Sequence, residues 1–442
     1  MFLRRVFVAP AAALFAVAFA GCAGSSTIGT TPAPIAGAST APASGTATPP
    51  GATPAASAAP AASATPKAGS TASAAPAPSE AASPGPSSAA FSLSKIKHVF
   101  IVILENESYG TTFAANPPAP YLAKTLPSMG ALLEGYYGVG HASLDNYIAM
   151  ISGQAPSLLT QSDCQDYLDF NLITVTTDGQ AAGAGCVFPA SVPNITDNLD
   201  KAGLTWRGYE EDMGNDPTRE SATCGHPVLN MQDHTQDAEA PSSANGEKGD
   251  QYATRHDPFM YFHSIVDNPI CNTNSLNFSH VAPDLSSIAT TANYNVFTPN
   301  LCDDGHDSPC ATGQAGGLPQ INVFLTNFIP EILNSPAYKQ DGLLLVTFDE
   351  AAETDGSDCC GELPGPNSPD PGLSSAVGGG GGVIGMVAIS RYIKPGTISM
   401  LPYNHYATLR TIEDVFGLPY IGYSQQTTLT DYGPDIFTNP GG

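Results

Sequence analysis

The sequence predicts an α/β fold with a mostly parallel central sheet and helices on both faces of that sheet. Apolar runs rich in β-branched residues recur along the chain and end abruptly in polar residues, which is typical of buried parallel strands. Segments with apolar residues at helical spacing lie between these runs. Residues 93–442 are long enough to form one large domain of this kind.

Four segments are expected to be strands of this sheet. They are residues 96–104, 293–297, 342–348 and 382–390. In an open α/β sheet, ligands bind outside the carboxyl ends of the strands. The polar residues that directly follow the first and third segments, Glu105-Asn106 and Asp349-Glu350, are therefore expected at a functional site.

Helices are expected between the strands. Residues 319–335 carry apolar side chains at helical spacing, and Asn404 is a suitable cap for a helix that runs to Phe416 and ends at Gly417. Residues 141–153 are expected to be a loop that continues into a helix. Strand, oxygen ligands, loop, serine and helix thus follow one another, an order that favours a metal-assisted hydrolase over a binding module.

The N-terminal segment is expected to be a targeting signal. Residues 1–21 combine Arg4 and Arg5 with an apolar stretch and a small-residue cleavage site. The cysteine that follows, Cys22, makes the segment similar to a bacterial lipoprotein signal, which implies a lipid on that residue. The alternative is an ordinary secretory signal followed by an incidental cysteine. Either reading predicts export to the cell envelope or beyond it.

Residues 22–92 are expected to be a tether between the lipid and the folded domain. Alanine, proline, serine and threonine dominate this segment, which therefore cannot bury enough apolar surface to offset its ordering entropy. A polar, partly polyproline-like tether would hold the domain 93–442 away from a membrane. The lipid on Cys22 is the only membrane contact that we expect.

The net charge of the chain bears on its partners. The formal charge is −25 at pH 7, which argues against nucleic acid because phosphate backbones are bound through lysine and arginine. An anionic substrate would have to be attracted locally, for instance by a metal ion.

The cysteines also indicate an exported protein. Eight cysteines follow Cys22, and an even number in an exported chain predicts up to four disulfides. Pairing of Cys164 with Cys186, and of Cys302 with Cys310, would close short loops. The neighbours Cys359-Cys360 are expected to pair with other cysteines rather than with each other. Zinc–thiolate ligation is the alternative, but the chain has no Cys-x-x-Cys pair.

Six blocks along the folded domain resemble a known family. They are Glu-Asn-Glu-Ser-Tyr at 105–109, His-x-Ser-x-x-Asn-Tyr at 141–147, Tyr-x-x-Arg-His-Asp-Pro-Phe at 252–259, Thr-Pro-Asn-Leu-Cys-Asp-Asp-Gly-His-Asp at 298–307, Phe-Asp-Glu at 348–350, and a block from Asn-His-Tyr to Glu-Asp at 404–414. Together they resemble the bacterial phosphoesterase family that contains acid phosphatases and phosphatidylcholine-type phospholipases C. The resemblance covers about residues 95–425 and implies an alkaline-phosphatase-like fold.

One divalent metal ion is expected at the two polar strand ends. Glu105, Asn106, Asp349 and Glu350 offer hard oxygen ligands, which suit Mg²⁺, Ca²⁺, Mn²⁺ or Zn²⁺. In the family that the chain resembles, the Glu-Asn pair binds the catalytic metal, and Ser143 Oγ is expected to complete the site. Two carboxylate-bearing strand ends would repel each other without a cation. A simple cap of the first strand is the alternative role for the first pair.

Ser143 is the expected nucleophile. A serine hydroxyl must lose its proton to attack phosphorus, and a bound metal can promote this without an adjacent base. The segment 143–146 also resembles the Thr/Ser-x-Pro-Asn element of nucleotide pyrophosphatases, with Asp145 in the place of proline. That resemblance implies that Asn146 binds a phosphoryl oxygen. Alternatively, Ser143 only caps the following helix. His141 is expected to support the site without binding metal or substrate.

Three histidines are expected to take part in the reaction. His256, His306 and His405, in their protonated form, would neutralise charge in the transition state and protonate the leaving oxygen, which favours activity below neutral pH. Asn300 and Asp304 are expected to contact the phosphate. The block around them lacks the complete Asp-x-x-Gly-His pattern that a second metal would require in the wider superfamily.

The expected function is therefore metal-dependent hydrolysis of phosphate monoesters, in the manner of an acid phosphatase. A phospholipase C-type phosphodiesterase is the alternative within the family; the lack of a lipid-binding module beyond the anchor favours monoesters. A surface lipoprotein that only binds a ligand would not need Ser143 and Asp349, and both are present. A sulfatase or phosphonate hydrolase is a further alternative, but no Cys/Ser-x-Pro-x-Arg element surrounds Ser143.

Overall fold

The computed structural model describes residues 91–352, 354–367 and 379–442. The expected signal at 1–21, its lipid site Cys22 and all but the last two residues of the expected tether lie outside the described residues. Among the helices that the structure describes, none has the length and apolar character to cross a membrane.

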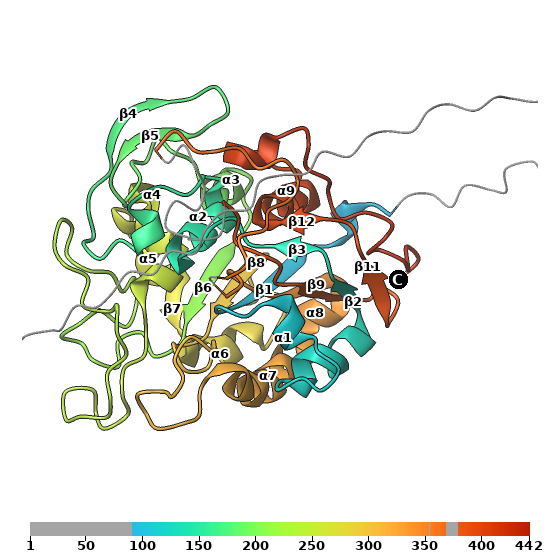
Figure 1. The fold of residues 1–442 in the computed structure, drawn as a ribbon, viewed down its shortest axis with the longest axis horizontal. Coiled ribbons are helices and arrows are strands. Elements are labelled where there is room, and N and C mark those ends of the chain that lie inside the picture. The colour runs from blue at the N-terminus through green and yellow to red at the C-terminus, as the bar shows by residue number, and fades with distance from the viewer. Residues whose placement is uncertain (1–90, 353, 368–378) are drawn as a thin grey trace, which may run out of the picture. The chain divides into compact units, whose positions relative to one another are not determined.

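An eight-stranded sheet forms the centre of the fold (Figure 1), with the strand order β11-β2-β10-β9-β1-β8-β6-β7. The strands are β1 (His98–Leu104), β2 (Ala131–Leu133), β6 (Trp206–Glu210), β7 (Ser275–Asn277), β8 (Tyr294–Thr298), β9 (Gly342–Phe348), β10 (Met386–Ser390) and β11 (Thr397–Ser399). β1 runs parallel to both β8 and β9, and β6 runs parallel to β7 and β8. β10 is antiparallel to β9 and β2. The expected mostly parallel sheet is confirmed.

All four expected strands are present with small shifts in their bounds. The two central strands, β1 and β9, are buried along their whole length, as their continuous apolar sequences predict. The largest shift is in β10, which begins at Met386 and not at residue 382. Gly382 and Gly385 have φ values of 73° and 77°, a left-handed backbone that interrupts an extended strand.

Helices cover both faces of the sheet (Figure 1). On one face, α2 (Ser143–Ser152), α3 (Ile195–Lys201) and α9 (His405–Phe416) contact one another. On the other face, α7 (Gly317–Asn334) contacts α6 (Val281–Leu285) and α8 (Pro336–Asp341). The remaining elements are shorter: α1 (Tyr109–Thr112), α4 (His263–Val266), α5 (Cys271–Asn274), β3 (Tyr136–Tyr137), β12 (Tyr403–Asn404), β4 (Asn171–Val175) and β5 (Ala181–Ala184).

The two helices expected from apolar spacing are α7 and α9. The cap of α9 is also as expected: the side chain of Asn404 accepts a hydrogen bond from the N–H of Ala407 at 3.0 Å. At the other end, Gly417 takes the left-handed conformation with φ 68° and ends the helix.

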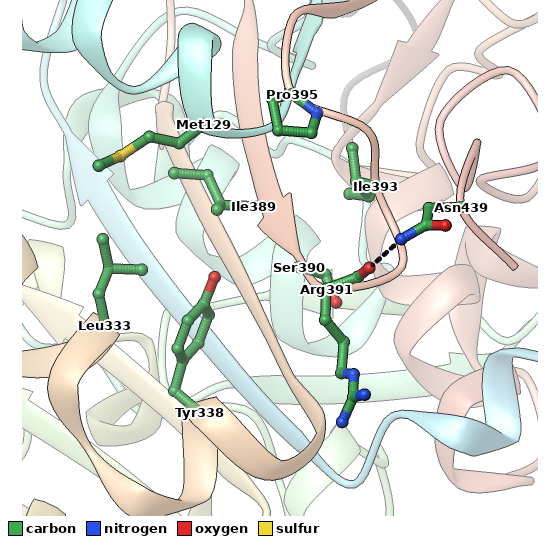
Figure 2. A pocket seen from close by; sticks show the side chains of 9 residues that line it. All are labelled: Met129, Leu333, Tyr338, Ile389, Ser390, Arg391, Ile393, Pro395 and Asn439. Atoms are coloured by element: carbon green, nitrogen blue, oxygen red, sulfur yellow. Dashed lines mark hydrogen bonds between the residues drawn. The ribbon is translucent and has the colours of Figure 1, made fainter. Parts of the chain in front are cut away.

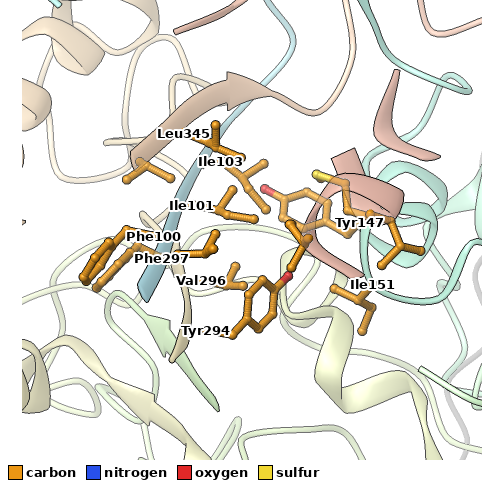
Figure 3. Close-up of a cluster of buried hydrophobic side chains, with 14 of the residues drawn as sticks. Phe100, Ile101, Ile103, Tyr147, Ile151, Tyr294, Val296, Phe297 and Leu345 are labelled. Carbon is orange, nitrogen blue, oxygen red and sulfur yellow. The ribbon is translucent and has the colours of Figure 1, made fainter. Parts of the chain in front are cut away.

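Apolar packing fixes α2 against the centre of the sheet. Figure 3 shows side chains of α2, including Tyr147 and Ile151, in one cluster with side chains from β1, β8 and β9 such as Ile103 and Val296. Each of these four side chains is at most 2% exposed. Because this packing holds α2 close to β1, the first residue of the helix, Ser143, lies at the carboxyl end of that strand.

Four disulfides connect the eight cysteines after residue 90. The expected pairs Cys164–Cys186 and Cys302–Cys310 are present, and Cys224 pairs with Cys271. The expectation for the adjacent cysteines was wrong: Cys359 and Cys360 are bonded to each other. The other six described cysteines are paired among themselves, so these two have no other partner within the described residues.

Candidate active site at the carboxyl ends of β1 and β9

Glu105 lies directly after β1 and is fully buried, and two hydroxyl groups of α2 donate to it. Ser143 Oγ donates to Glu105 Oε2 at 2.8 Å, and Tyr147 Oη donates to Glu105 Oε1 at 2.7 Å. Residues four apart lie on the same helix face, so the first turn of α2 presents both hydroxyls to one carboxylate. The N-cap residue of α2 is Ala142, and Asp163 Oδ1 accepts the N–H of Leu144 at 3.0 Å, so the alternative role of Ser143 as the helix cap is not seen. Tyr147 received no role from the sequence, although its spacing from Ser143 was a usable signal.

His256 lies between two carboxylates. Its Nε2 is 3.4 Å from Glu105 Oε1, and its Nδ1 is 3.2 Å from Asp304 Oδ2. His256 ends the short 3-10 helix η5 (Thr254–His256), and Asp304 lies in the loop after β8. The ring of Tyr147 stacks on the imidazole, with the ring centroids 5.3 Å apart. One ligand atom each from Glu105, His256 and Asp304 can be chosen so that all three lie within 4.8 Å of one another.

Asp349 adds a third carboxylate at the same edge of the sheet. It directly follows β9, whose last residue is in register with the last residue of β1. Asp349 Oδ1 accepts the backbone N–H of Asn106 at 3.0 Å. Burial and the negative charges of Asp349 and Asp304 raise the pKa of Glu105 well above its ordinary value. Burial also raises the pKa of Asp349, to about 6.

These groups fit a divalent cation. His256 Nε2, Asp304 Oδ2 and Asp349 Oδ2 are buried and have no hydrogen-bond partner among the described residues. Buried polar atoms normally have partners, and a bound ion is one explanation for atoms that have none among the protein groups. Burial, together with the positive charges of Arg255 and His306, lowers the pKa of His256, so one of its ring nitrogens is available as a ligand. Carboxylate oxygens with one imidazole are a donor set for Mn²⁺, Zn²⁺ or a related ion.

The donor set differs in part from the expected one. Glu105 and Asp349 belong to the donor set, as expected. Ser143, also expected as a ligand, is hydrogen-bonded to Glu105. Asn106 directs its amide Nδ2 to Glu105 Oε2 at 3.1 Å. His256, expected as an acid, lies among the candidate ligands. Sequence spacing could not reveal this, because His256 lies about 150 residues from Glu105 and reaches it only through the fold.

Glu350 faces the loop in front of α2. Its Oε2 is 2.6 Å from His141 Nδ1 and accepts the N–H of Ala142 at 3.2 Å. Ala142 has a φ of 147°, which L-residues rarely adopt, and it directly precedes Ser143. These contacts support a positioning role for Glu350 and His141. For His141 this agrees with expectation, whereas Glu350 was expected to bind the metal.

Asn146 fastens the same loop. Its Oδ1 accepts the N–H groups of Val139 at 2.8 Å and Gly140 at 3.3 Å, and its Nδ2 lies 3.0 Å from the carbonyl oxygens of Gly140 and Ala142. The side chain is fully buried. The expected contact between Asn146 and a phosphoryl oxygen stays a prediction; the contacts in the structure are those of a loop anchor.

Asn300 has a similar place in the loop after β8. Its Oδ1 accepts the N–H groups of Cys302 and Asp303, each at 3.0 Å, and its Nδ2 donates to Asp212 Oδ2 at 2.9 Å. These bonds shape the turn that carries Asp304 inward. Asp304, expected to contact phosphate, lies instead among the candidate metal ligands.

His306 and Arg255 form the outer side of the site. The imidazole of His306 is 32% exposed, and its centroid is 5.8 Å from that of His256. Arg255 Nη2 lies 3.1 Å from His306 Nε2, and Arg255 Nη1 donates to the carbonyl of Gln236 at 2.6 Å. His306 thus connects solvent with the buried cluster. Arg255 is a further residue to which the sequence gave no role; it directly precedes His256 in the block that carried the resemblance.

His405 differs from the expected protonated state. It is the first residue of α9 and is fully buried, and burial lowers its pKa to about 4. Its Nε2 is 2.6 Å from the backbone oxygen of Asp349, and its Nδ1 is 3.0 Å from Tyr136 Oη. At neutral pH the ring is therefore neutral, with both nitrogens engaged, and it holds the end of β9 that carries Asp349.

Comparison with known proteins identifies relatives with related activities. A family model described as the Phosphoesterase family matches residues 116–419. A probable acid phosphatase of Kluyveromyces lactis is 26% identical over 329 residues, which are 74% of this chain and 59% of that protein. A phosphatidylinositol-3-phosphatase of Mycobacterium tuberculosis is 25% identical over 336 residues, which are 76% of this chain and 82% of that protein.

The matched part of the chain spans only 54–59% of the length of the fungal acid phosphatases, including the phosphate-repressible acid phosphatase of Penicillium chrysogenum at 24% identity. Among solved structures, a protein of the alkaline phosphatase superfamily from Vibrio parahaemolyticus has a TM-score of 0.42 at 11% identity, covering 75% of this chain and 70% of that one. These structural similarities are weak.

Proposed function

The chain belongs to the Phosphoesterase family, and on this premise we propose that it is an acid-phosphatase-like phosphomonoesterase with Ser143 as its nucleophile. One observation carries the proposal: Ser143 Oγ hydrogen-bonds to Glu105 at the edge of a buried cluster with three unpartnered polar atoms. A serine hydroxyl that donates to a carboxylate has an acceptor for its proton when it attacks.

The proposal includes one divalent cation held by Glu105, His256 and Asp304, with Asp349 beside them. When bound, such an ion supplies positive charge that stabilises a phosphoryl group and promotes loss of the serine proton. The unpartnered buried atoms support this part of the proposal, as does the crowding of three carboxylates that raises the pKa of Glu105.

The chain's own residues account for the proton transfers. Ser143 Oγ attacks phosphorus and its proton passes to Glu105 Oε2, while the bond from phosphorus to the ester oxygen breaks. We assign protonation of that leaving oxygen to His306, the histidine that reaches solvent. Water then attacks the phosphoserine and gives a proton to His306. The proton on Glu105 returns to Ser143 Oγ as phosphate leaves, so the overall change is hydrolysis of one ester bond.

Monoesters are the proposed substrates. The residues of the proposed site are polar groups that suit a phosphate, and we assign none of them to the second organic group of a diester. The expected location, an exported protein that is lipid-anchored or secreted, also stays a proposal. The four disulfides support export, because such bonds persist in oxidising compartments.

The test compares p-nitrophenyl phosphate with p-nitrophenylphosphorylcholine, with and without chelator, for the wild type, Ser143→Ala and Ser152→Ala. Ser152 is a matched control, since it is a buried serine of the same helix whose Oγ donates to the carbonyl of Ile148. We expect chelator-sensitive turnover of the monoester that falls about 10³-fold or more in Ser143→Ala and persists in Ser152→Ala. Preference for the choline diester would favour the phospholipase C alternative. Full activity of Ser143→Ala would overturn the nucleophile, and inactivity of the wild type on both substrates would favour a binding protein.

A further inference from the structure

A group of lysines and one arginine lies at the edge of the sheet opposite the candidate active site. Lys97 directly precedes β1, and Lys339 lies in α8 just before β9. Arg391 follows β10, which runs in the opposite direction to β9. Glu105 and Asp349 follow the other ends of β1 and β9. A seven-residue strand is roughly 20 Å long, so about that distance separates the two edges.

Contacts among these segments bring the positive charges together. The N–H of Lys97 donates to the carbonyl of Asp341 at the end of α8, and Arg391 Nη1 donates to the carbonyl of Gln340. Lys95 Nζ lies 5.8 Å from the ring of Tyr392. We use the term basic face for Lys95, Lys97, Lys339, Arg391 and Lys394.

Within the described residues, no aspartate or glutamate forms an ion pair with a cation of the basic face, and Arg391 Nη2 donates to the oxygen of Gly442 at 3.2 Å. Twelve lysines and arginines follow residue 90. Four arginines make ion pairs with carboxylates: Arg207, Arg219, Arg255 and Arg410. Five of the remaining eight cations form the basic face. The nearby carboxylate of Asp341 is buried and lies 2.6 Å from His98 Nδ1. In a chain with a net charge of −25, this local group of positive charges indicates an anionic partner.

An apolar groove opens on the same edge. Figure 2 shows its lining, which includes Met129, Leu333, Tyr338, Ile389 and Ile393 beside Arg391. The groove has a volume of about 450 Å³, and Met129 at its side is 40% exposed. Cations beside an apolar groove match the two layers of a lipid surface, which are anionic headgroups and acyl chains.

We propose that the basic face, with the adjoining groove, docks the protein on an anionic lipid surface. Each lysine or arginine close to such a surface contributes about a fivefold gain in binding. The acidic groups at the opposite edge are farther away than the Debye length, about 8 Å at physiological salt, so salt screens their repulsion. Charge complementarity and the apolar groove therefore favour docking by this face in spite of the net charge.

Docking by this face turns the candidate active site away from the lipid. The edge of the sheet that carries Glu105 and Ser143 is then directed toward the aqueous phase, which matches soluble phosphate esters and not the headgroups of the membrane that carries the protein. This consequence rests on the proposed function, whereas the docking itself does not. A lipid-binding measurement without substrate therefore tests the docking proposal independently of the proposed function.

The test measures sedimentation of the exported protein with vesicles of phosphatidylglycerol and phosphatidylcholine, or of phosphatidylcholine alone. Cys22→Ser is present throughout, so that a lipid at that position does not contribute. We expect binding to the anionic vesicles that weakens about 25-fold in Lys97→Gln/Lys339→Gln, with turnover of p-nitrophenyl phosphate unchanged. The control is Lys248→Gln, which neutralises an exposed lysine near the carboxyl end of β6, on the other edge of the sheet, and should bind as the parent does.

Three outcomes would overturn the proposal. They are equal binding to both kinds of vesicle, equal weakening by Lys97→Gln/Lys339→Gln and by the control Lys248→Gln, and no sedimentation with anionic vesicles at low salt. A Lys97/Lys339-dependent self-association in ultracentrifugation without vesicle binding would assign the face to a second copy of the chain instead.

Discussion

Charged side chains are buried at one edge of the central sheet and exposed to solvent at the other. At the carboxyl ends of β1 and β9, three carboxylates are buried close together and two of them keep an unpartnered oxygen. At the other end of the same strands, Asp341 pairs with His98, and the lysines stay in water. Burial of unpaired charge costs several kcal/mol, so a fold keeps it only where it serves a function. The difference supports the proposed site of chemistry at the first edge and leaves the second edge as surface available to a partner.

Among changes that test this difference between the two edges, removal of the charge of Glu105 should have the largest effect. Glu105→Gln keeps an oxygen that can accept from Ser143 or Tyr147 but loses the carboxylate between the serine and the candidate metal. We expect turnover of p-nitrophenyl phosphate to fall by about 10³-fold or more, and affinity for the divalent ion, measured by calorimetry, to fall with it. Activity within tenfold of the wild type would show that this carboxylate is not central.

The pH dependence of the stability of the metal-free protein tests whether the buried carboxylates destabilise the fold. The pKa of Asp349 in the fold is about 6 against 3.8 for the free group, so its ionisation disfavours the folded state. This penalty is absent below pH 4, grows as the pH rises to 6, and reaches about 3 kcal/mol above that.

Denaturant unfolding of the chelator-treated protein should therefore show lower stability at pH 7 than at pH 5. The difference should shrink in Asp349→Asn and disappear when the divalent ion is restored. An equally stable metal-free protein at both values would contradict this account of the buried carboxylates.

Loss of the second hydroxyl on Glu105 should have a smaller effect. Tyr147→Phe keeps the stacking on His256 but removes the hydrogen bond to a charged carboxylate, a loss of about 1.5–3 kcal/mol. We expect kcat to fall about 10- to 100-fold while the protein stays folded by circular dichroism. Tyr294→Phe is a matched control in the same core cluster (Figure 3), away from Glu105, and should keep full activity.

The smallest effect is expected at the opposite edge. Lys97→Gln changes an exposed side chain that forms no ion pair with the part of the chain that the structure describes, so the free energy of unfolding should shift by less than about 0.5 kcal/mol and turnover should not change. A thermal melt and a phosphatase assay check this. A large loss in either would mean that the basic face is part of the folded framework and not a free surface.

The sequence predicted the strands and helices well because their signals are local. The buried runs of β1 and β9 and the Asn404 cap of α9 depend on neighbouring residues only. The strand-end carboxylates Glu105 and Asp349 followed from the same signals. His256 as a candidate ligand could not follow, because its place depends on a loop about 150 residues from β1.

Two other differences have equally specific causes. The buried, neutral state of His405 depends on packing under β9, which the sequence position at a helix start does not reveal. The Cys359–Cys360 bond was missed because adjacent cysteines were assumed to pair elsewhere, whereas all the other described cysteines have partners. In both cases the outcome depends on contacts between residues far apart in the sequence, which the local sequence does not reveal.

The most direct test of the central claim is to trap the covalent intermediate. The wild type, mixed with p-nitrophenyl phosphate and quenched in acid within milliseconds, should yield a phosphorylated peptide whose modified residue is Ser143 by mass spectrometry. The amount of this peptide should match the burst of p-nitrophenol, and Ser143→Ala should give neither. A phosphoryl group on a histidine or on another serine, at the level of the burst, would contradict the account.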